Sequence, residues 1–106
     1  MLDSYVHLYY EMLKIRIFEE KVMELHSEKM YGTTHLCTGQ EAVAVGICSA
    51  LIPDDVIFST HRGHGHYLAK GGQMDELMAE MYGKKGGCCN GRSGSLHIID
   101  KKINNM

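Results

Sequence analysis

The sequence of 106 residues has no marked excess of either charge and no long apolar run. Its 11 Lys and Arg residues and 13 Asp and Glu residues give a net charge of −2, which argues against binding to nucleic acids or anionic membranes through bulk electrostatics. Apolar runs of only a few residues exclude a membrane-spanning segment. The N-terminal residues lack the basic and apolar parts of a signal peptide. We therefore expect a cytoplasmic protein without nucleic-acid or membrane partners.

Proline occurs once, and the 4 cysteines do not form the framework of a secreted, disulfide-rich protein. Cys48 lies in an apolar run, while Cys88 and Cys89 are neighbours whose mutual disulfide would be strained. We expect reduced thiols, as is usual in the cytoplasm. By contrast, 12 glycines and 7 histidines are present, and 9 of the glycines lie in the second half of the sequence with His61, His64, His66 and His97.

Two long segments have helical patterns. Apolar residues at three- to four-residue spacing predict an amphipathic helix over residues 3–30, ended by Gly32. Its predicted buried stripe consists of Tyr5, Val6, Tyr9, Leu13, Ile17, Phe18, Val22 and Leu25. Thr38 and Glu41 form a capping box before residues 42–51. These are apolar almost all round, so we expect a buried helix there.

The second half of the chain predicts shorter elements. Residues 67–70 have the pattern of a short helical turn, and residues 74–82 that of an amphipathic helix closed by Gly83. Residues 56–58 are β-branched and aromatic, which predicts a short buried strand, and residues 96–99 could form a second strand.

One or two short strands cannot form a sheet that buries these helices, because an isolated strand leaves its backbone groups unpaired. An apolar strand after a helix is typical of a parallel sheet whose other strands lie elsewhere. We therefore expect an α/β fold, mostly helical, with one or two short strands of an incomplete parallel sheet. Residues 1–106 are expected to be part of a domain that further sequence or another chain completes.

The loop after the first predicted strand, residues 59–66, carries the sharpest chemical signal. Ligands of open α/β sheets bind at the carboxyl ends of strands, and the planar guanidinium of Arg62 suits a phosphate. His61, His64 and His66 could donate hydrogen bonds to the same anion. These histidines, with His35, Cys88 or Cys89, could instead bind zinc or another transition metal. Their spacing matches no closed zinc motif, however, and Arg62 would repel a dication, so no metal ligand is assigned.

Two further segments could contact a ligand. His35 stands before the helix predicted from Gly39, whose N-terminus favours an anion or developing negative charge. A neutral imidazole there could donate a proton or a hydrogen bond. Residues 91–97 form a flexible, donor-rich stretch that does not fit the P-loop pattern.

In four places the sequence resembles the alpha subunits of thiamine-diphosphate-dependent 2-oxo-acid dehydrogenases. Residues 35–42 (HLCTGQEA) resemble their H-x-x-x-G-Q-E-A signature, 59–66 (STHRGHGH) their Y/H-R-x-H segment, and 91–97 (GRSGSLH) their G-K/R-G-G-S-M-H stretch. Residues 15–20 resemble their first helix. The segments follow the family's order and spacing over nearly the whole chain. Residues 59–66 are most similar to acetoin dehydrogenases, with pyruvate dehydrogenases close behind.

This resemblance implies the beginning of a thiamine-diphosphate-binding α/β fold and gives roles to individual residues. His61 and Arg62 would contact the cofactor diphosphate and the substrate. His35 would face the substrate, and His64 would lie at the mouth of the active site. The residues that would border the substrate channel are Ser95, His97 and Asp100.

The resemblance also implies a reaction and partners. The family cleaves a 2-oxo acid or acetoin with thiamine diphosphate and passes the acyl group to lipoamide on the lipoyl acyltransferase of the complex. The beta subunit and the remainder of the alpha subunit would complete a heterotetramer, with the ligands of Mg²⁺ outside these residues. Two positions depart from the family, since Ser93 replaces a usual glycine and Cys37 stands where an aromatic residue is common. The chain alone is expected to be inactive.

Two hypotheses of other classes stay open. A non-catalytic interaction fragment would dock onto a partner through the long helix and the apolar helix over residues 42–51. It would co-purify with a beta-like chain without taking up cofactor. A small His/Cys metal-binding module would bind zinc stoichiometrically and release it on His61→Ala or His64→Ala.

Overall fold

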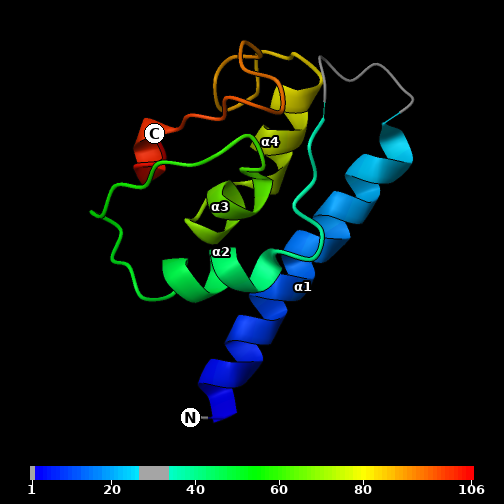
Figure 1. The fold of residues 1–106 in the computed structure, drawn as a ribbon. Coiled ribbons are helices and arrows are strands. Elements are labelled where there is room, and N and C mark those ends of the chain that lie inside the picture. Colours follow the sequence, from blue (N-terminus) through cyan, green and yellow to red (C-terminus); the bar gives the residue numbers. More distant parts are fainter. Residues whose placement is uncertain (1, 27–33) are drawn as a thin grey trace.

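The computed structural model describes residues 2–26 and 34–106, and within them lie four α-helices and one short 3₁₀ helix. The long helix α1 (Leu2–Leu25) runs along one side of the molecule, and the shorter elements pack on its flank (Figure 1). These shorter elements are α2 (Glu41–Cys48), α3 (His64–Ala69), α4 (Met74–Met81) and the 3₁₀ helix η1 (Lys101–Ile103). The mostly helical class is thereby confirmed.

The apolar core lies where α1, α2 and α3 contact one another and extends to α4. Its contribution from α1 is Ile15, Phe18 and Val22. The other buried members of the core are Cys37, Ala44, Val45, Tyr67, Leu68, Leu77, Met81 and Ile98. Removing these side chains from water is the main favourable term in folding.

The long amphipathic helix is confirmed, but its buried face differs from the predicted stripe. Five members of that stripe are exposed, namely Tyr5, Val6, Tyr9, Leu13 and Ile17. Phe18 and Val22 of the stripe are buried as predicted, and Ile15 and Glu19, which lie outside the stripe, are buried with them. The buried Glu19 carboxylate is tolerated because it accepts hydrogen bonds from the Cys37 N–H and from His64. The predicted end at Gly32 lies outside the described residues.

Helix α2 begins at Glu41, later than the predicted cap at Thr38. The residue before the helix is Gln40, and no side chain caps the first turn. The Glu41 carboxylate instead reaches back to accept the Gly39 N–H at 3.1 Å. The prediction that this helix is buried on all sides is also wrong. One face packs on the core, and large apolar side chains of the opposite face are exposed, namely Val43 and Ile47.

The predicted strands do not form within the described residues. Ile57 makes an isolated parallel bridge to Asn105, and Asp100 makes an antiparallel one to the same residue. The side chain of Phe58 is 82% exposed, so the prediction of a buried strand is wrong. A single bridge cannot cover both faces of a strand, which explains why these apolar side chains remain in contact with solvent.

The histidine-rich segment is partly helical rather than a loop. α3 begins at His64, three residues before the predicted helical turn, so His64 and His66 lie on a helix. α4 agrees with the helix predicted over residues 74–82, and Gly83 after it takes a φ of +70°. Residues 84–95 form turns and bends, as predicted.

Two further expectations concern membrane-spanning helices and the state of the cysteines. No helix among the described residues combines the length and the apolar character needed to cross a lipid bilayer. All four cysteines carry free thiols.

Gly72 lies where the chain turns back against Tyr67, and a larger residue does not fit. A Cβ at position 72 would lie 2.2 Å from Cε2 of the fully buried Tyr67 ring. We expect Gly72→Ala to lower the free energy of unfolding by about 1–3 kcal/mol, since it overpacks the core. Gly46→Ala is the control, because a Cβ there meets nothing within 4 Å inside α2 and should stabilise by about 0.5–1 kcal/mol. Urea titration of the two variants measures both effects, and equal losses would contradict the packing argument.

Candidate functional site

Two histidines from distant parts of the sequence meet at the surface. The ring centroids of His35 and His61 lie 5.0 Å apart, with an angle of 87° between the ring planes. His35 precedes α2 and is half-buried, whereas His61 precedes α3 and is exposed. This edge-on packing holds both imidazoles in place beside each other. The structure therefore brings together the residue expected to face the substrate and one expected to contact the cofactor.

Arg62 lies next to this pair and is held by neutral groups. Its Nη1 donates to the carbonyl oxygen of Leu36, and its backbone N–H donates to Oγ1 of Thr60 at 3.2 Å. Within residues 2–26 and 34–106, no carboxylate lies at ion-pair distance from the guanidinium. Its positive charge is thus not neutralised by these residues and can serve an anionic ligand.

A surface hollow of about 300 Å³ connects two of the sequence motifs. It lies between residues 59–63 and 96–99, and both His61 and His97 line it. Donor groups of the second and third family-like segments therefore face one space. Its size is at the lower end of the range for small-molecule sites.

His64 lies in the interior of this chain and not at the mouth of a site. Its side chain is fully buried, with Nδ1 2.6 Å from Oε1 of Glu19 and Nε2 2.7 Å from Oγ of Ser95. Because a carboxylate only accepts hydrogen bonds, Nδ1 of His64 donates to Glu19, while Nε2 is hydrogen-bonded to the Ser95 hydroxyl. We call this hydrogen-bonded series, Glu19–His64–Ser95, the relay; it joins α1, α3 and the 91–97 segment.

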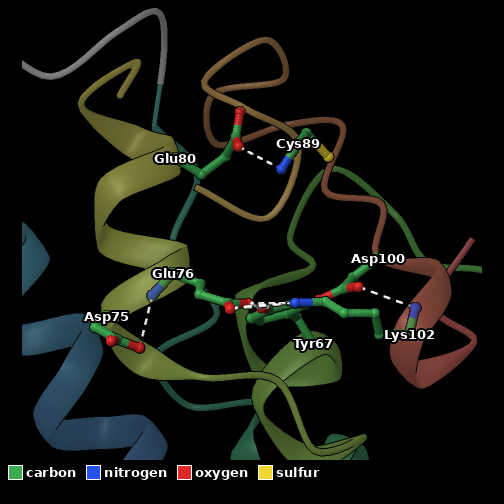
Figure 2. Close-up of polar contacts among 7 residues, drawn as sticks. All are labelled: Tyr67, Asp75, Glu76, Glu80, Cys89, Asp100 and Lys102. Atoms are coloured by element: carbon green, nitrogen blue, oxygen red, sulfur yellow. Dashed lines mark hydrogen bonds and ion pairs between the residues drawn. The ribbon is translucent and has the colours of Figure 1, made fainter. Parts of the chain in front are cut away.

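Asp100 also lies apart from the His61 hollow. Its carboxylate is buried and accepts the Lys102 N–H at 3.0 Å and the Tyr67 hydroxyl at 3.3 Å (Figure 2). The pKa of Tyr67 is raised well above its usual range, mainly because the phenol is buried. The neighbouring Cys88, Asp100 and Glu76 groups raise this pKa further. In this chain Asp100 therefore caps η1 and satisfies a buried phenol.

The histidines of the alternative zinc hypothesis do not converge. Both ring nitrogens of His64 are taken by Glu19 and Ser95, and Nδ1 of His66 is hydrogen-bonded to Oγ of Ser59. Among the described residues, the group of metal-ligating side chains that does converge is Glu80, Cys88 and Cys89, on another part of the molecule.

An ion pair that the sequence patterns did not predict joins α1 to the start of α2, just after the segment that carries His35. Nε of Arg16 on α1 lies 2.7 Å from Oε2 of Glu41, and Nη2 lies 3.0 Å from Oε1. The hydrogen bonds from Arg16, and further ones from backbone N–H groups such as that of Gly39, lower the pKa of Glu41 to about 2 against the desolvation by burial. The position of Glu41 in the G-Q-E-A segment gave no indication of this distant partner.

Glu41→Gln tests this pair by its pH dependence. The folded-state pKa of about 2 lies below the ordinary 4.5, so the stabilising contribution is full above pH 4.5 and is lost as the pH falls toward 2. We expect the variant to lose about 2–3 kcal/mol of unfolding free energy at pH 7 and to show a weaker acid dependence below pH 4.5. Urea titrations between pH 7 and 2.5 measure this. The exposed Lys21–Glu24 pair supplies the control Glu24→Gln, which should cost under about 1 kcal/mol. Equal acid sensitivity of Glu41→Gln and the parent chain would contradict the assignment.

Comparison with known proteins places these motifs in one family. Residues 9–106 match the family model described as dehydrogenase E1 component. The alpha subunit of acetoin:2,6-dichlorophenolindophenol oxidoreductase from Bacillus subtilis (strain 168) is 53% identical over 94 residues, 88% of this chain and 28% of that protein. The corresponding alpha subunit from Cupriavidus necator is 46% identical over 99 residues, 92% of this chain and 30% of that protein.

A pyruvate dehydrogenase relative extends the comparison to eukaryotes. The somatic, mitochondrial E1 component subunit alpha from Homo sapiens is 39% identical over 97 residues, 90% of this chain and 25% of that protein. The chain thus spans between 25% and 30% of the length of these three relatives. Because the family model matches most of the sequence, the chain belongs to the dehydrogenase E1 component family.

Proposed function

We propose that residues 1–106 form the N-terminal part of an alpha subunit that cleaves a C–C bond in a 2-oxo-acid or acetoin dehydrogenase complex. The observation that carries the proposal is the grouping of His35, His61 and an Arg62 guanidinium without a carboxylate partner among the described residues. Such a set offers donors and positive charge for the diphosphate of thiamine diphosphate, on which the E1 family depends in general.

His61 and Arg62 fit one half of a thiamine-diphosphate site, the half that binds the diphosphate. Arg62 and His61 would hold the diphosphate, since a guanidinium and an imidazole both donate hydrogen bonds to phosphate oxygens. Mg²⁺, which would offset the remaining diphosphate charge, would take its ligands from other residues. When bound, thiamine diphosphate supplies the nucleophilic carbon that cleaves the bond next to the substrate carbonyl, and the acyl fragment passes to lipoamide.

The remaining motif residues would act on the substrate side. His35, held against His61, would donate a hydrogen bond or a proton to the oxygen on which negative charge develops. His97 lines the same hollow as His61 and would border the substrate. Ser95 and Asp100 would act indirectly, through the hydrogen bonds that hold His64 and η1. His64 would position the 91–97 segment.

The exposed apolar surface supports the need for partners. Tyr5 and Tyr9 on α1 are 63% and 65% exposed, and Val43 and Ile47 on α2 are also exposed. Large apolar side chains exposed along a helix are typical of a contact with another protein segment. We propose that the remainder of the alpha subunit and a beta subunit cover them, and that a lipoyl acyltransferase receives the acyl group.

Purification of the tagged chain from its own cells tests this proposal. We expect a beta-type chain to co-purify and the complex to oxidise acetoin or pyruvate in a thiamine-diphosphate-dependent manner, whereas the chain alone shows no turnover. Arg62→Ala should raise the KM for thiamine diphosphate about 10- to 100-fold, because a charge-assisted contact is lost. The control Lys85→Ala, at an exposed residue beyond α4, should leave it unchanged.

Two results would overturn the proposal. A complex whose KM for thiamine diphosphate is unchanged by Arg62→Ala would remove this residue from the cofactor site. Co-purification of a partner without any cofactor uptake or turnover would favour the non-catalytic interaction fragment.

A further inference from the structure

A second group of reactive side chains lies at the end of α4, outside the His35–His61 site. One carboxylate oxygen of Glu80 and the sulfur atoms of Cys88 and Cys89 lie within 4.8 Å of one another. Adjacent residues in an extended segment point to opposite sides, but here the turns of residues 84–93 bring both thiols to the same carboxylate.

The Glu80 carboxylate is already oriented by the backbone. Its Oε1 accepts the N–H groups of Cys89 at 2.6 Å and Gly91 at 3.0 Å, and its Oε2 accepts that of Ser93 at 2.8 Å. Figure 2 shows this carboxylate turned from the helix toward the Cys89 amide. A carboxylate has about four lone-pair positions, so one on Oε2 stays free. Metal-binding carboxylates are typically held by hydrogen bonds of this kind.

The two thiols are reachable from solvent. Cys88 and Cys89 line a wide hollow of about 600 Å³, and both side chains are only partly buried. Sγ of Cys89 also lies 3.3 Å from the backbone N of Ile99, which donates to it. The thiol of Cys89 in turn donates to the carbonyl oxygen of Ile99 at 2.8 Å, so a metal bond to this sulfur would replace that hydrogen bond.

We propose that Glu80, Cys88 and Cys89 bind one thiophilic divalent cation of the Zn²⁺ type, with solvent from the hollow as the fourth ligand. Two thiolates and a carboxylate are a ligand set that suits zinc. Tetrahedral bonds of about 2.3 Å place two sulfurs about 3.8 Å apart, so the ligand atoms need to close by no more than about 1 Å. On binding, both S–H bonds break, two S–metal bonds form, and the two protons pass to solvent.

The Co²⁺ spectrum of the reduced, purified chain tests the proposal directly. Co²⁺ replaces Zn²⁺ at such sites, and thiolate ligands give a sulfur-to-cobalt charge-transfer band in the near ultraviolet that histidine ligands do not. We expect this band to saturate at one Co²⁺ per chain and to disappear when Zn²⁺ is added. Cys89→Ser should halve the band and weaken Co²⁺ binding at least about 10-fold. Cys48→Ser is the control, because this thiol lies on α2, and should change neither quantity.

The variants also separate metal binding from folding. Glu80→Gln is expected to weaken Co²⁺ binding, but it also alters the loop, so circular dichroism must show that each variant is folded. Cys89→Ser removes a partly exposed atom and keeps the carboxylate in place. A reduced chain without the charge-transfer band, or a band that Cys89→Ser leaves at full strength, would overturn the proposal. Both measurements are made without thiamine diphosphate and are independent of the dehydrogenase proposal.

Discussion

Replacing His64 by leucine is expected to lower the free energy of unfolding by about 3–5 kcal/mol. Leucine fills a similar volume but cannot donate a hydrogen bond. The fully buried Glu19 carboxylate would keep one partner, the Cys37 N–H at 2.7 Å, and lose His64 at 2.6 Å. A buried charge with missing hydrogen bonds costs far more than the pair itself contributes.

Urea unfolding of a small set of variants measures this effect. Ser95→Ala leaves Nε2 of His64 without a partner and should cost about 1–3 kcal/mol. The control His97→Ala removes an exposed imidazole and should stay within about 0.5 kcal/mol. The double variant Glu19→Leu with His64→Leu removes both polar partners together, so it should be less destabilised than the sum of the two single variants. A loss below 1 kcal/mol for His64→Leu would contradict the role of the relay.

The relay links stability to the proposed site. Ser95 lies in the segment that also carries His97, and His97 lines the hollow with His61. Holding Ser95 against a core histidine therefore fixes where this segment can face the ligand. In this chain His64 acts from the interior, by holding the 91–97 segment through Ser95.

Local patterns predicted the elements but not the faces that they bury. The start of α1 and the extent of α4 follow from apolar spacing and from Gly83. The buried face of α1 does not, because it depends on whether Glu19 finds partners, and these come from Cys37 and His64 far along the chain. Hydropathy alone penalises a buried glutamate, so the pattern gave Phe18 and Val22 correctly but not Glu19.

For the candidate site too, the sequence predicted the residues but not the contacts between distant segments. The family-like motifs identified His35, His61 and Arg62 as members of one site, and the structure brings these residues together. Motif order could not show that Ser95 pairs with His64, nor that Arg16 reaches Glu41, because such contacts depend on tertiary packing and not on spacing. The strand prediction failed for a related reason, since a strand needs partners that these residues do not supply.

Glu80→Ala is the second substitution with a large expected effect, of about 3–5 kcal/mol. The carboxylate is fully buried and satisfies three backbone N–H groups, those of Cys89, Gly91 and Ser93. Hydrogen bonds to a charged acceptor contribute about 1.5–3 kcal/mol each and are not additive when they share one acceptor. Removing the carboxylate leaves these donors without a partner inside a glycine-rich loop that has little apolar surface of its own.

Hydrogen exchange at these three amides separates loss of the loop from general destabilisation. We expect the Cys89, Gly91 and Ser93 amides to exchange much faster in Glu80→Ala, while amides of α1 change only by the global loss of stability. The comparison variant is Glu76→Ala on the same helix, which removes the ion pair to Lys102 and a long hydrogen bond from the Tyr67 hydroxyl at 3.4 Å (Figure 2). It should cost about 1 kcal/mol, because Tyr67 keeps Asp100 as an acceptor. Burial alone would raise the pKa of Glu80, but the N–H groups of Ser93, Cys89 and Gly91 outweigh it and lower the pKa below the ordinary 4.5. The contribution is therefore present above that pH and is lost on acidification below it, so the parent chain and Glu80→Ala should converge in stability at low pH. Equal exchange rates in both proteins would show that the loop is held by something other than this carboxylate.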